Sequence, residues 1–166
     1  MAAVRIFGID PGSRLTGFGA VECDRHGRLH YLTSGCIRLA SARPLAERLR
    51  ELHANLADLL VELAPQEVSV ERVFMARNAD SALKLGHARG VAMLAAAQRA
   101  VPVVEYSARQ IKQAVVGHGG AEKSQVQHMV AALLGLPARP QADAADALAA
   151  ALCHAHCRAL AARLAG

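Results

Sequence analysis

The hydrophobic residues of this chain change their spacing once, near residue 40, and this change restricts the possible folds more than any other feature. Before it, apolar runs at 4–10, 15–22 and 29–39 are separated by turn residues, which is typical of consecutive antiparallel strands. After it, Pro44 opens a stretch in which leucines recur every three or four residues until Pro65, the pattern of an amphipathic helix. The chain is therefore predicted to contain both sheet and helix.

The rest of the sequence predicts strands that alternate with helices. The expected strands are 67–71 and 101–105, and the expected helices are 78–99, 107–117, a segment ending at Gly135, and one that Pro140 opens. With 166 residues and no evident linker or internal repeat, the chain has room for one domain with a real core. We predict a single α/β domain over residues 1–166, in which helices cover a mixed five-stranded sheet.

Composition and charge exclude several classes of protein. Because 53% of the residues are hydrophobic and 20% are charged, disorder is excluded as the main state. The 19 basic residues outnumber the 14 acidic ones, and the net charge of +5 favours a polyanionic partner. Aromatic residues make up 3%, too few for a broad platform that stacks single-stranded bases. No apolar run approaches the about 20 residues that a membrane helix requires.

The four cysteines are expected to be free, buried thiols. The sequence begins without the pattern of a secretory signal, so we predict a cytoplasmic location, where disulfides are rare. Cys153 and Cys157 enclose two histidines on one predicted helix, and a zinc site there is the alternative interpretation. Ligands packed this densely in an alanine-rich helix are unusual, so free thiols are preferred.

Acidic residues supply the strongest functional signal, because five of them stand where the local pattern favours apolar residues or where a helix begins. Asp10 and Glu71 end predicted strands. If these strands are parallel and joined by a right-handed crossover, their carboxyl ends meet at one sheet edge. Asp143 and Asp146 are three residues apart at a helix start and can project into the same crevice. Glu105, which ends another predicted strand, is the fifth candidate.

Carboxylates gathered in one crevice would repel one another unless cations neutralised them. Hard oxygen ligands favour Mg²⁺ or Mn²⁺ over zinc. In a basic protein this arrangement predicts two-metal phosphoryl chemistry on a phosphodiester. Taken singly, each acid has an ordinary explanation, since Asp10 can close a turn and the helix-start acids can interact with the helix dipole. The conjunction favours a metal site.

Three weaker sequence signals each allow two interpretations. The loop 117–120 before Lys123 fits a phosphate-binding loop and a plain connector equally well. Phe74 fits the core better than an exposed wedge for nucleic acid. Gly86 and Gly90 share one helix face, where they allow close approach either within the domain or across a dimer interface.

Five blocks of sequence match one known family in order. They are residues 8–13 with 16–17 (GIDPGS and TG), 71–82 (ERVFMARNADSA), 86–90 (GHARG), 121–126 (AEKSQV) and 141–149 (QADAADALA). The match runs from about residue 6 to about residue 152 and resembles the RuvC family of Holliday junction resolvases. The later blocks are highly specific, whereas the opening block alone would not be.

The resemblance implies an RNase H-like fold and a Mg²⁺-dependent endonuclease. It implies a homodimer that nicks four-way junction DNA symmetrically in recombination and repair, beside a branch-migration complex of the RuvA and RuvB type. Two Mg²⁺ per active site are implied, with Mn²⁺ as a substitute. The implied catalytic and metal-binding acids are Asp10, Glu71, Asp143 and Asp146, so Glu105 drops out. The implied DNA contacts are Phe74, which moves from the core to the junction centre, and Lys112 and Lys123 near the scissile strand. The basic side chains expected to hold backbone phosphates are Arg77, Lys84 and Arg89.

Two other function classes fit less well. Kinases of the actin and sugar-kinase type also begin with a strand and an Asp-x-Gly loop, but they need a second lobe for which 166 residues leave no room. A noncatalytic junction-binding module agrees with the net charge. It leaves the clustered acids unexplained, because uncompensated carboxylates would repel DNA.

Overall fold

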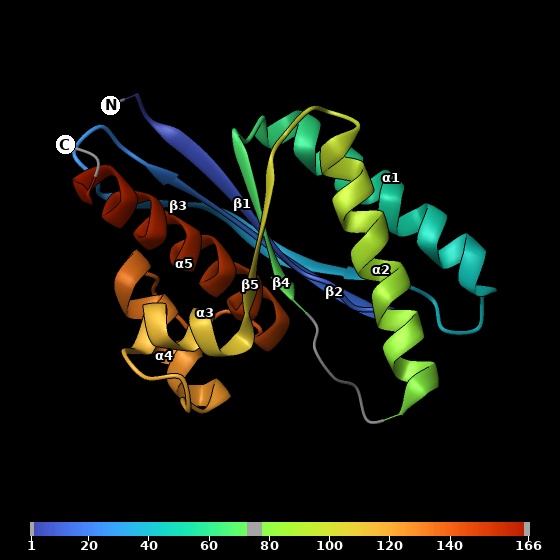
Figure 1. Ribbon diagram of the computed structural model, residues 1–166. Coiled ribbons are helices and arrows are strands. Elements are labelled where there is room, and N and C mark those ends of the chain that lie inside the picture. The colour runs from blue at the N-terminus through green and yellow to red at the C-terminus, as the bar shows by residue number, and fades with distance from the viewer. Residues whose placement is uncertain (1, 73–77, 165–166) are drawn as a thin grey trace.

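One mixed sheet of five strands organises the molecule (Figure 1). The computed structural model describes residues 2–72 and 78–164, so Phe74 and Arg77 lie outside the described residues. The strands are β1 (Val4–Asp10), β2 (Leu15–Cys23), β3 (Leu29–Arg38), β4 (Glu67–Arg72) and β5 (Val103–Ser107). Their order in the sheet is β3-β2-β1-β4-β5, in which β2 is antiparallel to both neighbours and β1, β4 and β5 are parallel. The predicted mixed five-stranded sheet is confirmed.

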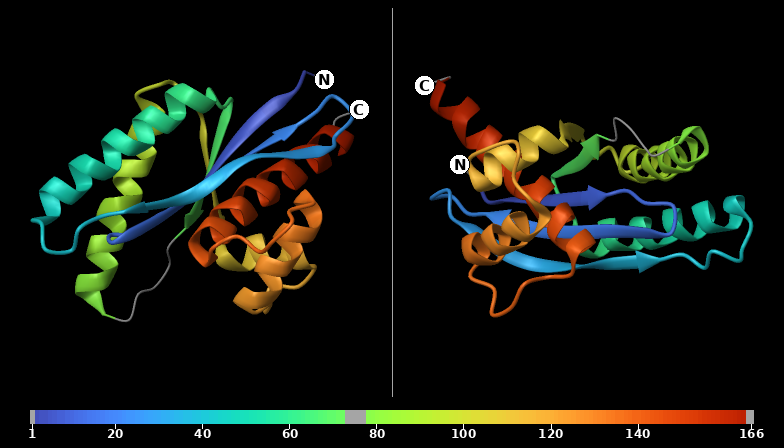
Figure 2. Two further views of the ribbon diagram at one scale, coloured as in Figure 1. Left: turned by 180° about the vertical axis from the view of Figure 1, so that it is seen from behind. Right: turned by 90° about the horizontal axis from the view of Figure 1, so that it is seen from below.

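Helices cover both faces of this sheet and produce three layers (Figure 2). The helices are α1 (Leu45–Leu63) and α2 (Ala79–Ala97) on one face, and α3 (Ala108–Val116), α4 (Lys123–Leu134) and α5 (Ala142–Leu164) on the other. Side chains alternate along a strand, so β1 sends Phe7 into the core under α1 and α2 and Ile6 into the core under α5. Within the described residues, no helix is long and apolar enough to cross a membrane.

Polar caps and glycines set several helix ends where the sequence places them. Asn78 begins α2 by accepting a hydrogen bond from a backbone N–H of the first turn at 2.9 Å, and Ser107 begins α3 with a capping box. Gly117 and Gly135 end α3 and α4 with φ values of 94° and 62°, which glycine adopts without strain. The connector interpretation of the loop after α3 therefore has a structural basis.

The last strand begins later than the sequence predicts. The apolar run predicts residues 101–105, but β5 starts at Val103. The reason is that α2 closes without a glycine: Ala100 takes a φ of 54°, and the Val101 N–H donates to the Ala96 carbonyl at 3.1 Å. Pro102 then follows, and it has no N–H to contribute to a strand. At its other end β5 runs on to Ser107, so Glu105 lies inside the strand rather than at its end, and the strand-end argument for this acid was wrong.

Glycines in β1 and β2 allow α5 to lie very close to the sheet. A Cβ atom at Gly8 would come within 2.0 Å of the Ala147 carbonyl oxygen, and one at Gly17 would come within 2.0 Å of the Asp143 carbonyl oxygen. Any side chain at either position would push the helix away, so glycine is required for this approach. The first turns of α5 therefore rest directly on the sheet beside the end of β1.

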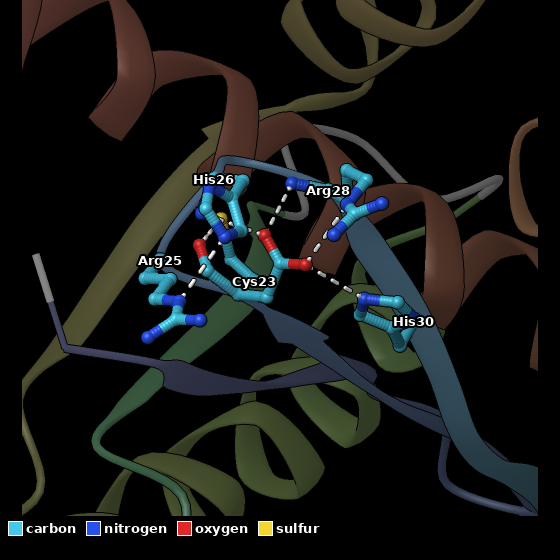
Figure 3. Close-up of polar contacts among 6 residues, drawn as sticks. Cys23, Arg25, His26, Arg28 and His30 are labelled. Atoms are coloured by element: carbon cyan, nitrogen blue, oxygen red, sulfur yellow. Dashed lines mark hydrogen bonds and ion pairs between the residues drawn. The ribbon is translucent and has the colours of Figure 1, made fainter.

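A single carboxylate organises the turn between β2 and β3 (Figure 3). Asp24 accepts hydrogen bonds from the backbone N–H groups of Arg28 at 2.9 Å and His26 at 2.8 Å, and its side chain also contacts His30 Nε2 and Arg28 Nε, each at 3.1 Å. These contacts, led by the Arg28 backbone N–H, hold the pKa of Asp24 well below its ordinary value of 3.8. The turn is thus stabilised by the ionised form of Asp24.

We expect Asp24→Asn to lower the Tm at neutral pH but to have little effect in acid. A native pKa below the unfolded value means that the stabilisation is present above the ordinary pKa of 3.8 and is lost as the pH falls below it. Thermal unfolding followed by circular dichroism from about pH 7 to about pH 2 measures this difference. A difference in Tm that stayed constant over this range would contradict the proposed role of the charge.

The thiols are free, as predicted, but not all are buried. Cys153 is buried and Cys157 is exposed, whereas the other two cysteines are half-buried. The histidines between Cys153 and Cys157 bind elsewhere, with His154 Nε2 on the Glu67 carboxylate and His156 Nδ1 on a backbone carbonyl at 3.1 Å. Across residues 2–72 and 78–164, no group of histidine, cysteine and acidic side chains has the arrangement of a zinc site.

Candidate active site

Asp10 and Glu71 lie at the carboxyl ends of two neighbouring parallel strands. In the register of β1 and β4, Ile9 pairs with Val70, and each acid is the next residue of its strand. The connection between the strands runs through β2, β3 and α1, and it brings β4 to the side of β1 opposite β2. The predicted meeting of the two acids at one sheet edge is therefore confirmed.

Both side chains point toward α5. Gly8 faces α5, and the two-residue period of a strand gives Asp10 the same orientation. In β4 the Ser69 hydroxyl donates a hydrogen bond to the Ala150 carbonyl of α5 at 2.8 Å, so Glu71, two residues further, also faces this helix. The acids are thus on the face that carries the remaining candidates.

The start of α5 brings Asp143 and Asp146 to the same edge. Both are half-buried in the first turns of the helix, which Gly17 and Gly8 hold against the sheet. Both carboxylates act on the charge of Asp10. The structure therefore brings together all four acids that the sequence singles out.

A cavity of about 200 Å³ opens between these acids and helices α3 and α4. Its charged lining comes from Asp10, Glu71 and Asp146 together with Lys112 and Lys123, and apolar residues of α3 and α4 form the rest. Asp143 does not line this cavity. It lies toward β3, where its charge acts on the half-buried thiol of Cys36. Three of the four acids therefore line the cavity, and the fourth, Asp143, lies on the β3 side of the end of β1.

Burial and mutual repulsion make the acids difficult to ionise together. Burial, followed by the charges of Glu71, Asp146 and Asp143, raises the pKa of Asp10 from 3.8 to about 8. Burial is also the largest cause that raises the pKa values of Glu71 and Asp146, and a neighbouring carboxylate adds to each. A group of buried acids with raised pKa values, lining a cavity, is the arrangement expected of a candidate functional site.

Lys123 partly neutralises the cluster. Its Nζ lies 3.2 Å from Asp146 Oδ2, and this ion pair raises the pKa of Lys123. The same lysine lowers the pKa of Asp146, but burial outweighs it, so the net shift of Asp146 is upward. Lys112 acts in the same direction on Glu71 and Asp146. The two lysines are therefore the cations that line the cavity beside the acids.

The donor chemistry fits a hard divalent cation. In the part of the chain that the structure describes, no three acidic, histidine or cysteine side chains form a ready-made metal cage. The cavity nevertheless presents carboxylate oxygens, which are the ligands that Mg²⁺ and Mn²⁺ prefer. Burial and the neighbouring carboxylates disfavour the ionised form of Asp10, and a bound cation would favour it.

The loop that follows Asp10 is held from two sides. The buried Thr16 hydroxyl accepts a hydrogen bond from the Gly12 N–H at 3.1 Å and donates one to the Gly12 carbonyl at 2.8 Å. From α1, Arg48 Nη1 donates to the Ser13 carbonyl at 2.8 Å. Arg48 is only 8% exposed, and its Nε has no hydrogen-bond partner among the residues that the structure describes. A buried guanidinium with an unsatisfied N–H is unfavourable, so its presence indicates a role in holding this loop.

Sequence reasoning overlooked Arg48, although a signal for it exists. The apolar stripe of α1 runs through Leu45, Leu52 and Leu56, and Arg48 occupies the stripe position between the first two. A charged residue on the buried face of an amphipathic helix requires a specific partner. Here the partner is the backbone of the loop beside Asp10.

We expect Arg48→Met to make the peptide bond after Arg14 accessible to trypsin. Methionine fills much of the same space but cannot donate to the Ser13 carbonyl, so the loop should open locally more often. Cleavage between Arg14 and Leu15, followed by mass spectrometry, should accelerate about tenfold, which corresponds to about one lost hydrogen bond. Arg50→Met on the exposed side of α1 is the matched control. Equal cleavage of both variants would show that the loop does not depend on Arg48.

The cations expected to contact DNA occupy different surroundings. Lys112 and Lys123 line the cavity. Lys84 forms an ion pair with an aspartate one turn earlier in α2 at 2.5 Å. Arg89 is half-buried and donates from Nε to Glu105 at 2.7 Å, which ties α2 to β5. Glu105 thus has its own cationic partner and is not part of the cavity.

Comparison with protein families identifies one match. Residues 6–154 match the family described as "Crossover junction endodeoxyribonuclease RuvC". Relatives of that name include one from Marinobacter nauticus, 63% identical over 152 residues, which cover 91% of this chain and 85% of the relative. Another, from Idiomarina loihiensis, is 61% identical over 155 residues, which cover 91% of this chain and 86% of the relative.

Solved structures give the same result. RuvC of Thermus thermophilus in complex with a Holliday junction substrate is 36% identical, with a TM-score of 0.89 over 95% of this chain and 96% of that one. A yeast mitochondrial Holliday junction resolvase has a TM-score of 0.70 at 14% identity, over 96% of this chain and 81% of that one, which shows the fold alone. These neighbours have the RNase H-like fold, so the expected fold is confirmed.

Proposed function

This chain belongs to the RuvC family of crossover junction endodeoxyribonucleases, and on that premise we propose that it resolves Holliday junctions by hydrolysing phosphodiesters in two symmetric strands. The observation that carries the proposal is the group of four acids at the end of β1 and β4, with raised pKa values at Asp10, Glu71 and Asp146. A net charge of +5 favours binding to the polyanionic DNA backbone, and the acidic site is where we expect the phosphodiester to be cleaved.

Asp10, Glu71, Asp143 and Asp146 are the residues proposed to hold the divalent cations, two Mg²⁺ in each site with Mn²⁺ able to replace them. When bound, the cations supply an activated water and neutralise charge on the phosphodiester. Asp10 must release its proton before it can act as a ligand, because its pKa lies at about 8. Lys112 and Lys123 then stabilise the negative charge that develops on the phosphate.

The remaining proposed DNA contacts are expected to contribute unequally to binding. Lys84 is half-buried in an ion pair on the surface of α2 and can exchange its carboxylate partner for a backbone phosphate. Arg89 would have to leave a half-buried ion pair with Glu105, so we expect the smaller contribution from it. Phe74 remains a proposed contact near the junction centre on the family resemblance, and Arg77 remains a proposed contact to a backbone phosphate.

A homodimer is proposed through α2. A Cβ atom at Gly86 or Gly90 would meet nothing within 4 Å in the part of the chain that the structure describes, so packing within the domain does not explain these glycines. On the same helix Leu83 and Leu94 are 65% and 51% exposed. Two copies related by a twofold axis would present two active sites to a symmetric junction. Sedimentation equilibrium should give twice the 17.5 kDa chain mass, and a strict monomer would contradict the dimer.

We also propose a cytoplasmic location, which is consistent with four free cysteines. A branch-migration complex of the RuvA and RuvB type is the proposed protein partner. Pull-down of purified components on a four-way junction tests this association, and an absence of any contact would contradict it.

The decisive experiment uses a labelled synthetic four-way junction with and without Mg²⁺. We expect two symmetric nicks that appear only with the cation, and ligatable linear duplex products. Binding without nicking in Mg²⁺ and in Mn²⁺ would instead favour the noncatalytic junction-binding module. A linear duplex of the same sequence is the control, because selectivity for the branched form is part of the proposal.

A further inference from the structure

Two arginines lie on neighbouring backbone segments on the β3 side of the acidic site. Leu15 of β2 pairs with Arg38 of β3, and the Leu39 N–H donates to the Arg14 carbonyl at 2.9 Å. Arg14 and Arg38 are both exposed. Within the described residues, neither has an acidic partner, whereas several other arginines do, namely Arg5, Arg28, Arg43, Arg89 and Arg158.

Arg14 projects from an anchored loop. Its neighbours Gly12 and Ser13 are the ones held by the Thr16 hydroxyl and by the buried guanidinium of Arg48. A loop with these anchors loses little conformational freedom when its side chain binds a ligand, because the backbone is already ordered. Two exposed arginines on neighbouring, ordered backbone, with no acidic partner among the described residues, are available to bind an external anion.

Arg38 faces the same side of the sheet as the acids. Gly17, which contacts the Asp143 carbonyl in α5, pairs with Cys36, and Arg38 follows two residues later on the same face. The surroundings of the Cys36 thiol agree with this placement: burial and then the Asp143 charge raise its pKa, whereas Arg38 lowers it. The arginine charge therefore lies beside the acids.

We propose that Arg14 and Arg38 form a binding site for the phosphodiester backbone of the DNA strand that enters the active site. The inference rests on the proposed nuclease function. β3 lies two strands away from β1, or about 10 Å, which places the gripped phosphate about one to three nucleotides from the scissile bond. Lys112 and Lys123 contact the strand on the α3 and α4 side, so the strand passes over the acids between two groups of cations.

The test compares two double variants with the same net charge. Arg14→Gln/Arg38→Gln removes the proposed site, and Arg99→Gln/Arg163→Gln removes two arginines that follow α2 and end α5, far along the chain from the acids. Affinity for a four-way junction is measured without divalent cations at several salt concentrations. We expect the first variant to bind about tenfold more weakly, with a slope of log K against log salt that is smaller by about 2. The second variant should stay within about twofold of the wild type.

Equal losses in the two double variants, or an unchanged salt slope in the first, would overturn the proposal. Arg14→Lys/Arg38→Lys keeps both charges and should retain the slope, which separates loss of contact from loss of fold. Unfolding temperatures of all variants are measured in parallel. Failure of the proposed function looks different, because then the wild type itself would not nick junctions in Mg²⁺.

Discussion

Asp146→Asn should bind a four-way junction about as tightly as the wild type and should nick it about a thousandfold more slowly, or not at all. Asp146 lines the cavity between Asp10 and Lys123, so the amide keeps its size but loses the charge needed to hold a divalent cation. Removing a negative charge also weakens repulsion of the DNA backbone, so binding should not suffer. Single-turnover nicking in excess enzyme separates the chemical step from product release.

Glu62→Gln, at an exposed position of α1, is the charge-matched control for this variant. It should nick junctions at the wild-type rate. Retained nicking by Asp146→Asn in both Mg²⁺ and Mn²⁺ would remove Asp146 from the catalytic group. Loss of binding together with nicking would instead show that Asp146 positions the DNA or the fold, and Tm values of both variants distinguish these cases.

Asp10→Asn should abolish nicking and, without divalent cations, make the protein more stable than the wild type at about pH 8. Burial and three neighbouring carboxylates raise the native pKa of Asp10 from 3.8 to about 8. The folded state therefore binds its proton more tightly than the unfolded state, and the wild type loses stability as the pH rises from about 4 to about 8. Asparagine carries no proton to lose, so the variant avoids this loss.

The expected gain is on the order of 2–5 kcal/mol, or roughly 5–15 °C in Tm, because each pKa unit corresponds to about 1.4 kcal/mol. Thermal unfolding in a chelator at several pH values measures it. The two Tm curves should converge toward about pH 4. Adding Mg²⁺ should stabilise the wild type more than the variant, because only the complete ligand set binds it well. Identical Tm values at about pH 8 would contradict the electrostatic account, and Asp58→Asn on exposed α1 controls for the loss of one charge.

The acids could be found from the sequence because each interrupts a regular pattern. Asp10 and Glu71 end apolar runs that are long enough to be recognised as strands, and a parallel crossover then fixes which ends meet. Asp143 and Asp146 share a helix start. Local periodicity and one rule of chain topology were sufficient for this part of the site.

Other features depend on contacts between distant segments and could not be read from local patterns. The start of β5 moved because Ala100 adopts a left-handed conformation that a sequence argument assigns to glycine. Arg38 ends an ordinary strand in the sequence, and only its pairing with Leu15 places it beside Arg14. The sequence leaves the role of Gly86 and Gly90 open for the same reason, since only the folded structure shows whether another segment of the domain packs against them.

The glycines of β1 and β2 that contact helix α5 also determine how close the proposed catalytic acids of this helix lie to the sheet. Because α5 rests against the backbone of the sheet at Gly8 and Gly17, the short side chains of Asp143 and Asp146 start close to the end of β1. A methyl group added at either glycine would move both acids outward together. Displacements of about 1 Å can reduce a reaction rate about a hundredfold. Gly8 and Gly17 have no functional group, yet they determine the spacing of the proposed catalytic acids.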